Sequence, residues 1–148
     1  MLGAFIVSVE LGDVDDSKMD LVVKTKDISL GTGGTTFTVK EGSNTEEILY
    51  WPGISLSDSD RRSMIYEATL EALEKARDRK ANRVGFFTMG FEVSRVPSWE
   101  VAEEIVRAVV NHSKTENNLH SVFLIAGSPI QVSSFQFALN NIATIVHK

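Results

Sequence analysis

The sequence predicts a single α/β domain of three layers, in which helices cover a mixed, mostly parallel central sheet. From Ser57 onward, amphipathic segments of helical period alternate with short apolar segments, an order typical of parallel strands joined by helices. Residues 3–51 are rich in strand-like segments, which predicts hairpin-like strands at one edge of the sheet. No linker or repeat divides the chain, so residues 1–148 are expected to form one domain.

Four short segments before Ser57 have the composition of strands. They alternate apolar or β-branched residues with polar ones, or form a short apolar run, and turn-forming residues such as Gly12 and Pro52-Gly53 separate them. The stretch over 24–34 contains several glycines and predicts a loop. The expected strands cover residues 3–10, 19–23, 35–39 and 47–51.

Three helices and two further strands are expected after this region. Ser57 and Asp60 resemble a capping box with a shorter acid, and the apolar residues from Ile65 to Ala76 follow helical spacing. Pro97-Ser98 opens a second helix whose apolar side chains form two adjacent rows. The expected order is a helix over 57–80, a strand over 84–89, a helix over 98–112, a strand over 121–127, a helix over 132–142 and a short strand around Val146.

Composition and charge exclude several classes of function. The chain has no cysteine, which excludes disulfides, thiolate metal sites and a cysteine nucleophile. A formal net charge of −5 argues against a dedicated nucleic-acid-binding protein, because that affinity rests on neutralising phosphates. No apolar run approaches the ~20 residues of a membrane span, and the N-terminus lacks the pattern of a signal peptide. A cytoplasmic protein without membrane contact is therefore expected.

The clearest indication of a ligand site lies where the strand over 84–89 meets the helix over 98–112. Thr88-Met89-Gly90 follows the apolar strand directly. In open α/β sheets, ligands bind in the crevice beyond the carboxyl ends of the strands, where backbone N–H groups and helix dipoles converge. The unit indicates where a site would lie without indicating what binds there.

Several motifs follow one another in an order found in a known family. They are Gly12-Asp13-Val14 with the strand over 19–23, the glycine-rich residues 29–34, Gly90 with residues 97–102, and the final strand and helix. In this order they resemble the macro domain, a module that binds ADP-ribose, and the fold class expected is macro domain-like. The resemblance implies that Asp13 contacts the adenine and that glycines contact the phosphates. The ligand-binding residues it implies are Asp13, Gly31, Gly33, Gly34, Thr88, Gly90 and Phe91.

The chain departs from the family pattern at one place that matters for catalysis and at another that matters for phosphate binding. Residues 24–27 read Lys-Thr-Lys-Asp where the family commonly has an Asn-Ala-Ala-Asn run that contacts the distal ribose and supports hydrolysis. Phe91 and Glu92 stand in the second phosphate loop, where bare backbone is expected. The segment before Ser57 is also short, so the family's first helix is expected to be missing or replaced by a hairpin. We therefore expect a non-catalytic module that binds an ADP-ribose-like nucleotide or acts through protein contacts.

Two other functions stay open at this point. An ADP-ribose ester or phosphoester hydrolase would use Asp27 or Glu92 as a substitute base, provided that burial in the crevice raises the pKa of that carboxyl. A structural subunit without a small-molecule site would form a symmetric homo-oligomer through valine-rich helix faces and the strand over 36–39.

No metal and no cofactor are expected. His112, His120 and His147 lie far apart in the sequence and lack the carboxylate spacing of metal sites. The aspartates between Asp13 and Asp20 miss the spacing of a calcium loop and are interpreted as a solvated acidic turn.

Overall fold

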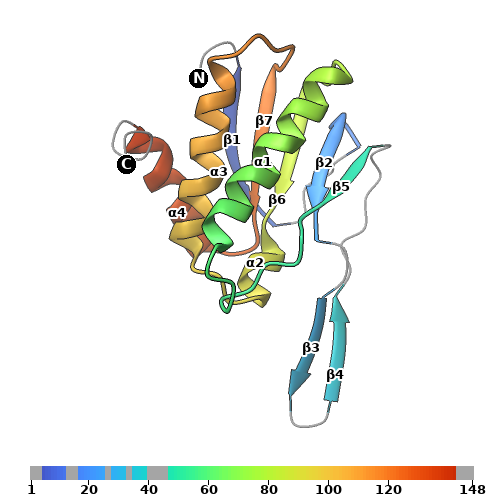
Figure 1. The fold of residues 1–148 in the computed structure, drawn as a ribbon, viewed down its shortest axis with the longest axis vertical. Coiled ribbons are helices and arrows are strands. Elements are labelled where there is room, and N and C mark those ends of the chain that lie inside the picture. The colour runs from blue at the N-terminus through green and yellow to red at the C-terminus, as the bar shows by residue number, and fades with distance from the viewer. Residues whose placement is uncertain (1–4, 13–16, 26–27, 33–34, 40–46, 143–148) are drawn as a thin grey trace.

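A five-stranded parallel sheet forms the centre of the molecule (Figure 1). The computed structural model describes residues 5–12, 17–25, 28–32, 35–39 and 47–142. Every neighbouring pair in the sheet is parallel. Across the sheet, the order is β1 (Ile6–Leu11), β7 (Ser121–Ala126), β6 (Arg83–Phe87), β2 (Leu21–Lys24) and β5 (Ile48–Tyr50). The expected α/β class is confirmed, as is the mostly parallel character expected of the central sheet.

A separate antiparallel pair extends from the end of the sheet that carries α2 (Met89–Val93) (Figure 1). It consists of β3 (Ile28–Thr32) and β4 (Thr35–Val39), paired from Ile28 opposite Val39 to Thr32 opposite Thr35. The loop expected over 24–34 therefore contains a strand, whereas the strand expected over 35–39 is present. The antiparallel component of the expected mixed sheet is this hairpin, which lies outside the central sheet.

The helices begin and end close to their expected limits, with two differences at their starts. Asp58 accepts a hydrogen bond from the backbone of Ser55 at 2.9 Å, so the turn that it closes delays the first helix to residue 61. Ser128 accepts from the backbone of Gln131, and Pro129 occupies the first position of the last helix, which starts before the expected residue 132. The long helices are α1 (Arg61–Asp78), α3 (Ser98–Ser113) and α4 (Pro129–Asn140).

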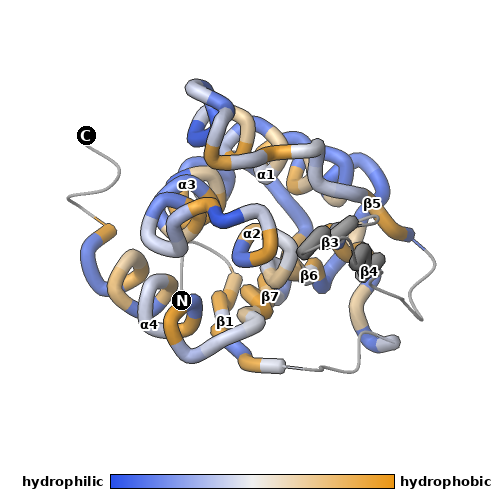
Figure 2. Tube along the Cα trace, turned by 90° about the horizontal axis from the view of Figure 1, so that it is seen from below, coloured by the Kyte–Doolittle hydropathy of each residue, from blue (hydrophilic) through white to orange (hydrophobic). Residues whose placement is uncertain are grey.

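All three long helices pack on one face of the sheet, which differs from the expected three layers (Figure 2). The connections from β5 to β6 and from β6 to β7 step across the sheet in the same direction, so right-handed crossovers place α1 and α3 on the same side. The connections from β1 to β2 and from β2 to β5 step the other way. The described residues of those two connections contain the β3–β4 hairpin and no helix.

The main core lies between this face and the helices. Phe86 and Leu124 of the sheet are fully buried there beside Ile65, Ile105 and Phe135 of the helices. The opposite face carries a smaller buried cluster of Met19, Val22, Phe87 and Ile125. Within the described part of the chain, no helix has the length and apolar character needed to cross a membrane.

Three carboxylates of α3 join it to α1 through arginines. Glu100 receives two hydrogen bonds from Arg61, at 2.7 and 2.9 Å. Arg62 contacts Glu103 at 2.6 Å and Glu104 at 2.7 Å. The three glutamates are buried, so each requires its cationic partner to offset the cost of desolvation. This network fixes the register of the two helices and holds the beginning of α3, which follows the carboxyl end of β6.

Candidate functional site

The carboxyl ends of β2, β6 and β7 meet at one edge of the sheet, and the segments that leave them form the candidate site. Thr25 follows β2, Met89-Gly90 begins α2 after β6, and Gly127-Ser128 links β7 to α4. Viewed from below, α2 lies at this edge beside the ends of β6 and β7 (Figure 2). We call this strip of backbone and short side chains the carboxyl edge.

Two glycines allow the segments of the carboxyl edge to approach one another closely. A Cβ atom at Gly90 would lie 1.9 Å from Oγ1 of Thr25 and 2.8 Å from its Cβ. A Cβ atom at Gly127 would lie 3.0 Å from the Cβ of Met89. The end of β2 therefore contacts α2 only because residue 90 has no side chain, and the strip is bare backbone at both positions.

The side chain of Gln131 links two of these segments through hydrogen bonds. Its Oε1 accepts a hydrogen bond from the backbone of Gly127 at 2.7 Å, and its Nε2 donates to the carbonyl oxygen of Thr88 at 2.8 Å. The hydroxyl of Thr88 lies 3.0 Å from the carbonyl oxygen of Ile125 and 3.1 Å from Oε1 of Gln131. Thr88 and Gln131 are buried, so their side chains shape the edge instead of facing a ligand. The sequence pattern gave no signal for this role of Gln131.

Phe91 anchors α2 in the core. It is 4% exposed, and its ring packs edge-on against Trp51 with 5.0 Å between the ring centroids. The indole nitrogen of Trp51 donates to the carbonyl oxygen of Phe87 at 2.8 Å. The side chain that the sequence suggested as a ligand contact thus lies within the core. Only its backbone is near the edge.

The acidic candidate Glu92 is exposed at the rim of the carboxyl edge. Its carboxylate accepts a hydrogen bond from the hydroxyl of Ser128, the residue that caps α4. The side chain of Glu92 is therefore not enclosed within the crevice, as a substitute base was expected to be. Of the other candidates, Gly31 lies in β3 opposite Thr36, and β3 contacts α2. Asp13, Asp27, Gly33 and Gly34 lie outside the described residues.

One cation lies beside the edge at the end of β2. Lys24 is 6% exposed, and its ammonium group lies 4.3 Å above the ring centroid of Phe87. A cation–π contact of this kind holds a charge in place at a buried position. Among the described residues, no group of three His, Asp or Glu side chains could hold a metal ion.

Comparisons with known proteins show which solved structures share the fold of this chain. No protein-family model matches the sequence, and a search of curated proteins finds no match. Among solved structures, a macrodomain mutant from Oceanobacillus iheyensis with ADPR is similar with a TM-score of 0.75 and 15% identity, covering 97% of each chain. A Trypanosoma brucei macrodomain in complex with ADP has a TM-score of 0.70 and 11% identity, covering 90% of this chain and 69% of that one.

The chain has a macro domain-like fold. The likeness extends over nearly the whole chain, so the resemblance found in the sequence motifs is confirmed at the level of the fold. A tomato leucine aminopeptidase mutant is also similar, with a TM-score of 0.51 and 12% identity, covering 95% of this chain and 37% of that one. At these identities the comparisons establish the macro domain-like architecture and leave the ligand to be inferred from the site.

Proposed function

We propose that this macro domain-like chain is a non-catalytic module that binds an ADP-ribose-like nucleotide at the carboxyl edge. The observation that carries the proposal is the change in direction of the chain connections at the neighbouring strands β2 and β6. From β2 the chain connects to β5 on one side, and from β6 it connects to β7 on the other side, so the two connections run in opposite directions across the sheet. In parallel α/β sheets such a change of direction opens a crevice for ligands.

The chemistry of the carboxyl edge suits a diphosphate. Gly127 is exposed and carries no side chain, so a phosphate oxygen can approach the main chain between β7 and α4 closely. The solved macrodomains with ADPR and with ADP, which share the fold, support a nucleotide of this class as the ligand.

Binding without hydrolysis is the better supported form of this function. A general base needs a carboxyl whose pKa is raised toward neutrality by burial or by a neighbouring charge. Glu92 is exposed and already accepts a hydrogen bond from Ser128. The residues 24–27, which stand in place of the asparagine run, offer no amide side chain to position a distal ribose. The hydrolase alternative rests on Asp27, a residue outside the described range.

Calorimetric titration with ADP-ribose at low salt, with AMP as the comparison ligand, tests the proposal. We expect saturable binding of ADP-ribose and weaker binding of AMP, because AMP lacks the second phosphate and the distal ribose. Asp13→Ala should abolish binding, because the resemblance assigns the adenine contact to the carboxylate of Asp13. Gly127→Val should weaken binding at least about tenfold, since a branched side chain covers the bare strip beside Met89.

Gly53→Val is the matched control for the glycine variant. Gly53 is exposed, has no heavy atom within 4 Å of an added Cβ, and lies outside the carboxyl edge. Its substitution should leave the affinity for ADP-ribose unchanged. Equal affinities of the two valine variants would place the nucleotide elsewhere, and release of free ADP-ribose from an ester substrate would replace the non-catalytic reading with the hydrolase.

A further inference from the structure

The last helix is unusual in this acidic chain because it carries no charge. From Asn117 to His147 the sequence contains no Asp, Glu, Lys or Arg, although 24% of all residues are of these types. Even so, α4 is a surface helix on which Ile130 is 70% exposed and Phe137 is 65% exposed. Depletion of charge together with exposed aromatic and aliphatic side chains distinguishes the centre of a protein interface from ordinary surface.

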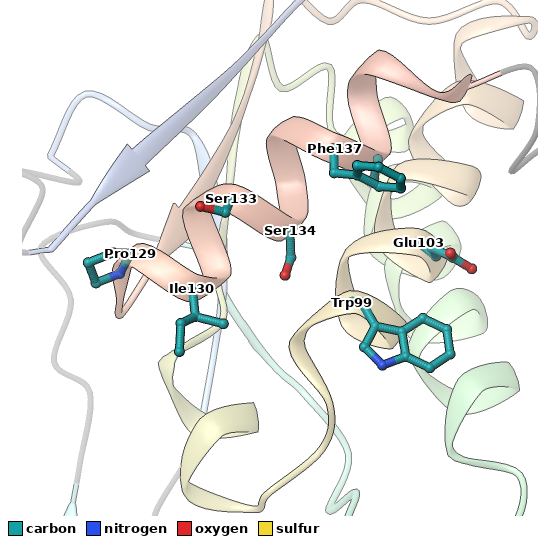
Figure 3. Close-up of a pocket in the computed structure, with 8 residues that line it drawn as sticks. Trp99, Glu103, Pro129, Ile130, Ser133, Ser134 and Phe137 are labelled. Atoms are coloured by element: carbon teal, nitrogen blue, oxygen red, sulfur yellow. The ribbon is translucent and has the colours of Figure 1, made fainter.

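A groove of about 650 Å³ runs beside this helix, between α4 and the beginning of α3 (Figure 3). Ile130, Ser134 and Phe137 form one wall and are spaced along α4 as a single ridge. Trp99 of α3, 53% exposed, forms the opposite wall. The small side chains of Ser134 and Ala138 leave the middle of the groove open.

The α3 wall of the groove is held in place before any partner arrives. The guanidinium of Arg62 lies 5.2 Å from the ring centroid of Trp99, and the same group pairs with Glu103 at 2.6 Å. Glu103 also lines the groove, so its charge is neutralised from behind. An exposed tryptophan fixed in this way loses little conformational freedom on binding, which lowers the entropic cost of association.

We propose that this surface, the α3–α4 groove with the ridge of α4, binds a second copy of the same chain. Along the ridge the side chains run large, small, small, large: Ile130, Ser133, Ser134 and Phe137. This pattern is self-complementary. When two copies of α4 cross about a twofold axis near Ser134, Ile130 of each copy faces Phe137 of the other, and the serines allow close approach.

Charge favours a second copy over an unrelated charged partner. Two molecules with a formal net charge of −5 repel each other, and that repulsion is smallest where they meet through a helix without charge. A strongly charged partner would find no opposite charge on α4 with which to form an ion pair. If each large side chain offers ~200 Å², Trp99, Ile130 and Phe137 together expose roughly 380 Å² per copy. A standard interface buries about 800 Å² per partner, so the remaining area has to come from the flanking surfaces of α3 and α4, and the dimer is expected to be weak and reversible.

Sedimentation equilibrium of the full chain tests the proposal, with substitutions at the twofold axis. The wild type should approach twice the monomer mass of 16.3 kDa at concentrations up to about 100 µM. Ser134→Asp and Ser134→Arg should each remain monomeric, because each brings two like charges together at the axis. Mixing these two variants should restore a dimer of one copy of each, since opposite charges then meet.

Gln136→Asp is the matched control, because Gln136 is exposed on α4 and lies off the ridge. It should dimerise as the wild type does. Phe137→Ser provides a second loss-of-contact variant, and circular dichroism verifies that every variant is folded. A monomeric wild type would overturn the proposal and leave the groove to a different protein or a small molecule. A dimer that persists in both Ser134 variants would place the contact between copies on another surface.

Discussion

Gln131→Met should lower the free energy of unfolding by about 2 kcal/mol, because it removes two hydrogen bonds worth about 1 kcal/mol each. These are the bonds from the backbone of Gly127 at 2.7 Å and to the carbonyl oxygen of Thr88 at 2.8 Å. Methionine has nearly the same length as glutamine and fills irregular space, so no large cavity is expected. The carbonyl oxygen of Thr88 keeps its hydrogen bond from the backbone of Phe91 at 3.1 Å, so the penalty is not larger.

Urea denaturation followed by circular dichroism measures this change, and the melting temperature should fall by about 4–8 °C. Gln136→Met is the control, because it makes the same substitution at an exposed position on the same helix. Its effect should stay within about 0.5 kcal/mol of the wild type. Equal stabilities of the two methionine variants would refute the role of Gln131 in joining the segments of the carboxyl edge.

Three further predictions concern the edge and the helices behind it. Gly90→Ala should cost about 1–3 kcal/mol in a denaturation experiment, because the added methyl group overlaps Thr25, and adding Thr25→Gly should recover part of the loss. Glu92→Gln should strengthen ADP-ribose binding in a low-salt titration by about twofold to fivefold, since it removes a negative charge near the proposed phosphates. Stability should fall as the pH drops below about 6.5, because burial lowers the pKa of His112 in the folded state and the unfolded chain then binds more protons.

Each of these three predictions has a result that would count against it. Full stability of the Gly90→Ala variant would mean that Thr25 moves aside without cost. An unchanged affinity of Glu92→Gln for ADP-ribose would mean that the carboxylate of Glu92 does not influence the bound nucleotide. For the pH dependence, the urea midpoint of the wild type should fall more between neutral and low pH than that of His112→Phe. Parallel curves for the two proteins would assign the effect to other groups.

The sequence predicted an element well where its apolar residues follow a regular spacing and residues that end helices or strands flank it. The helix over 98–112 and the strand over 121–127 carry long apolar rows or runs, and the structure confirms both within one residue. The five-residue helix α2 was not expected. A segment this short shows no measurable helical period of apolar residues, and its second residue is a glycine. The start of α4 could have been found from Ser128-Pro129, a capping residue followed by proline at the first helical position.

The site itself was only partly accessible to sequence reasoning. Gly90 was identified from its place after a strand, and the structure gives a physical reason for it in the contact with Thr25. The burial of Phe91 against Trp51 depends on residues 40 positions apart, which no local pattern reveals. Gln131 was missed for the same reason, since a polar residue that satisfies buried backbone groups looks like a surface residue in the sequence.

The most direct test of the central claim is an NMR titration of the isotopically labelled chain with ADP-ribose. The account predicts saturable shifts of the backbone amide signals of Gly90 and Gly127, while the amide signal of Lys80, just beyond the far end of α1, should not move. It would be contradicted by saturable shifts confined to other regions, or by no shift at millimolar nucleotide, because the carboxyl edge would then hold no ligand of this class.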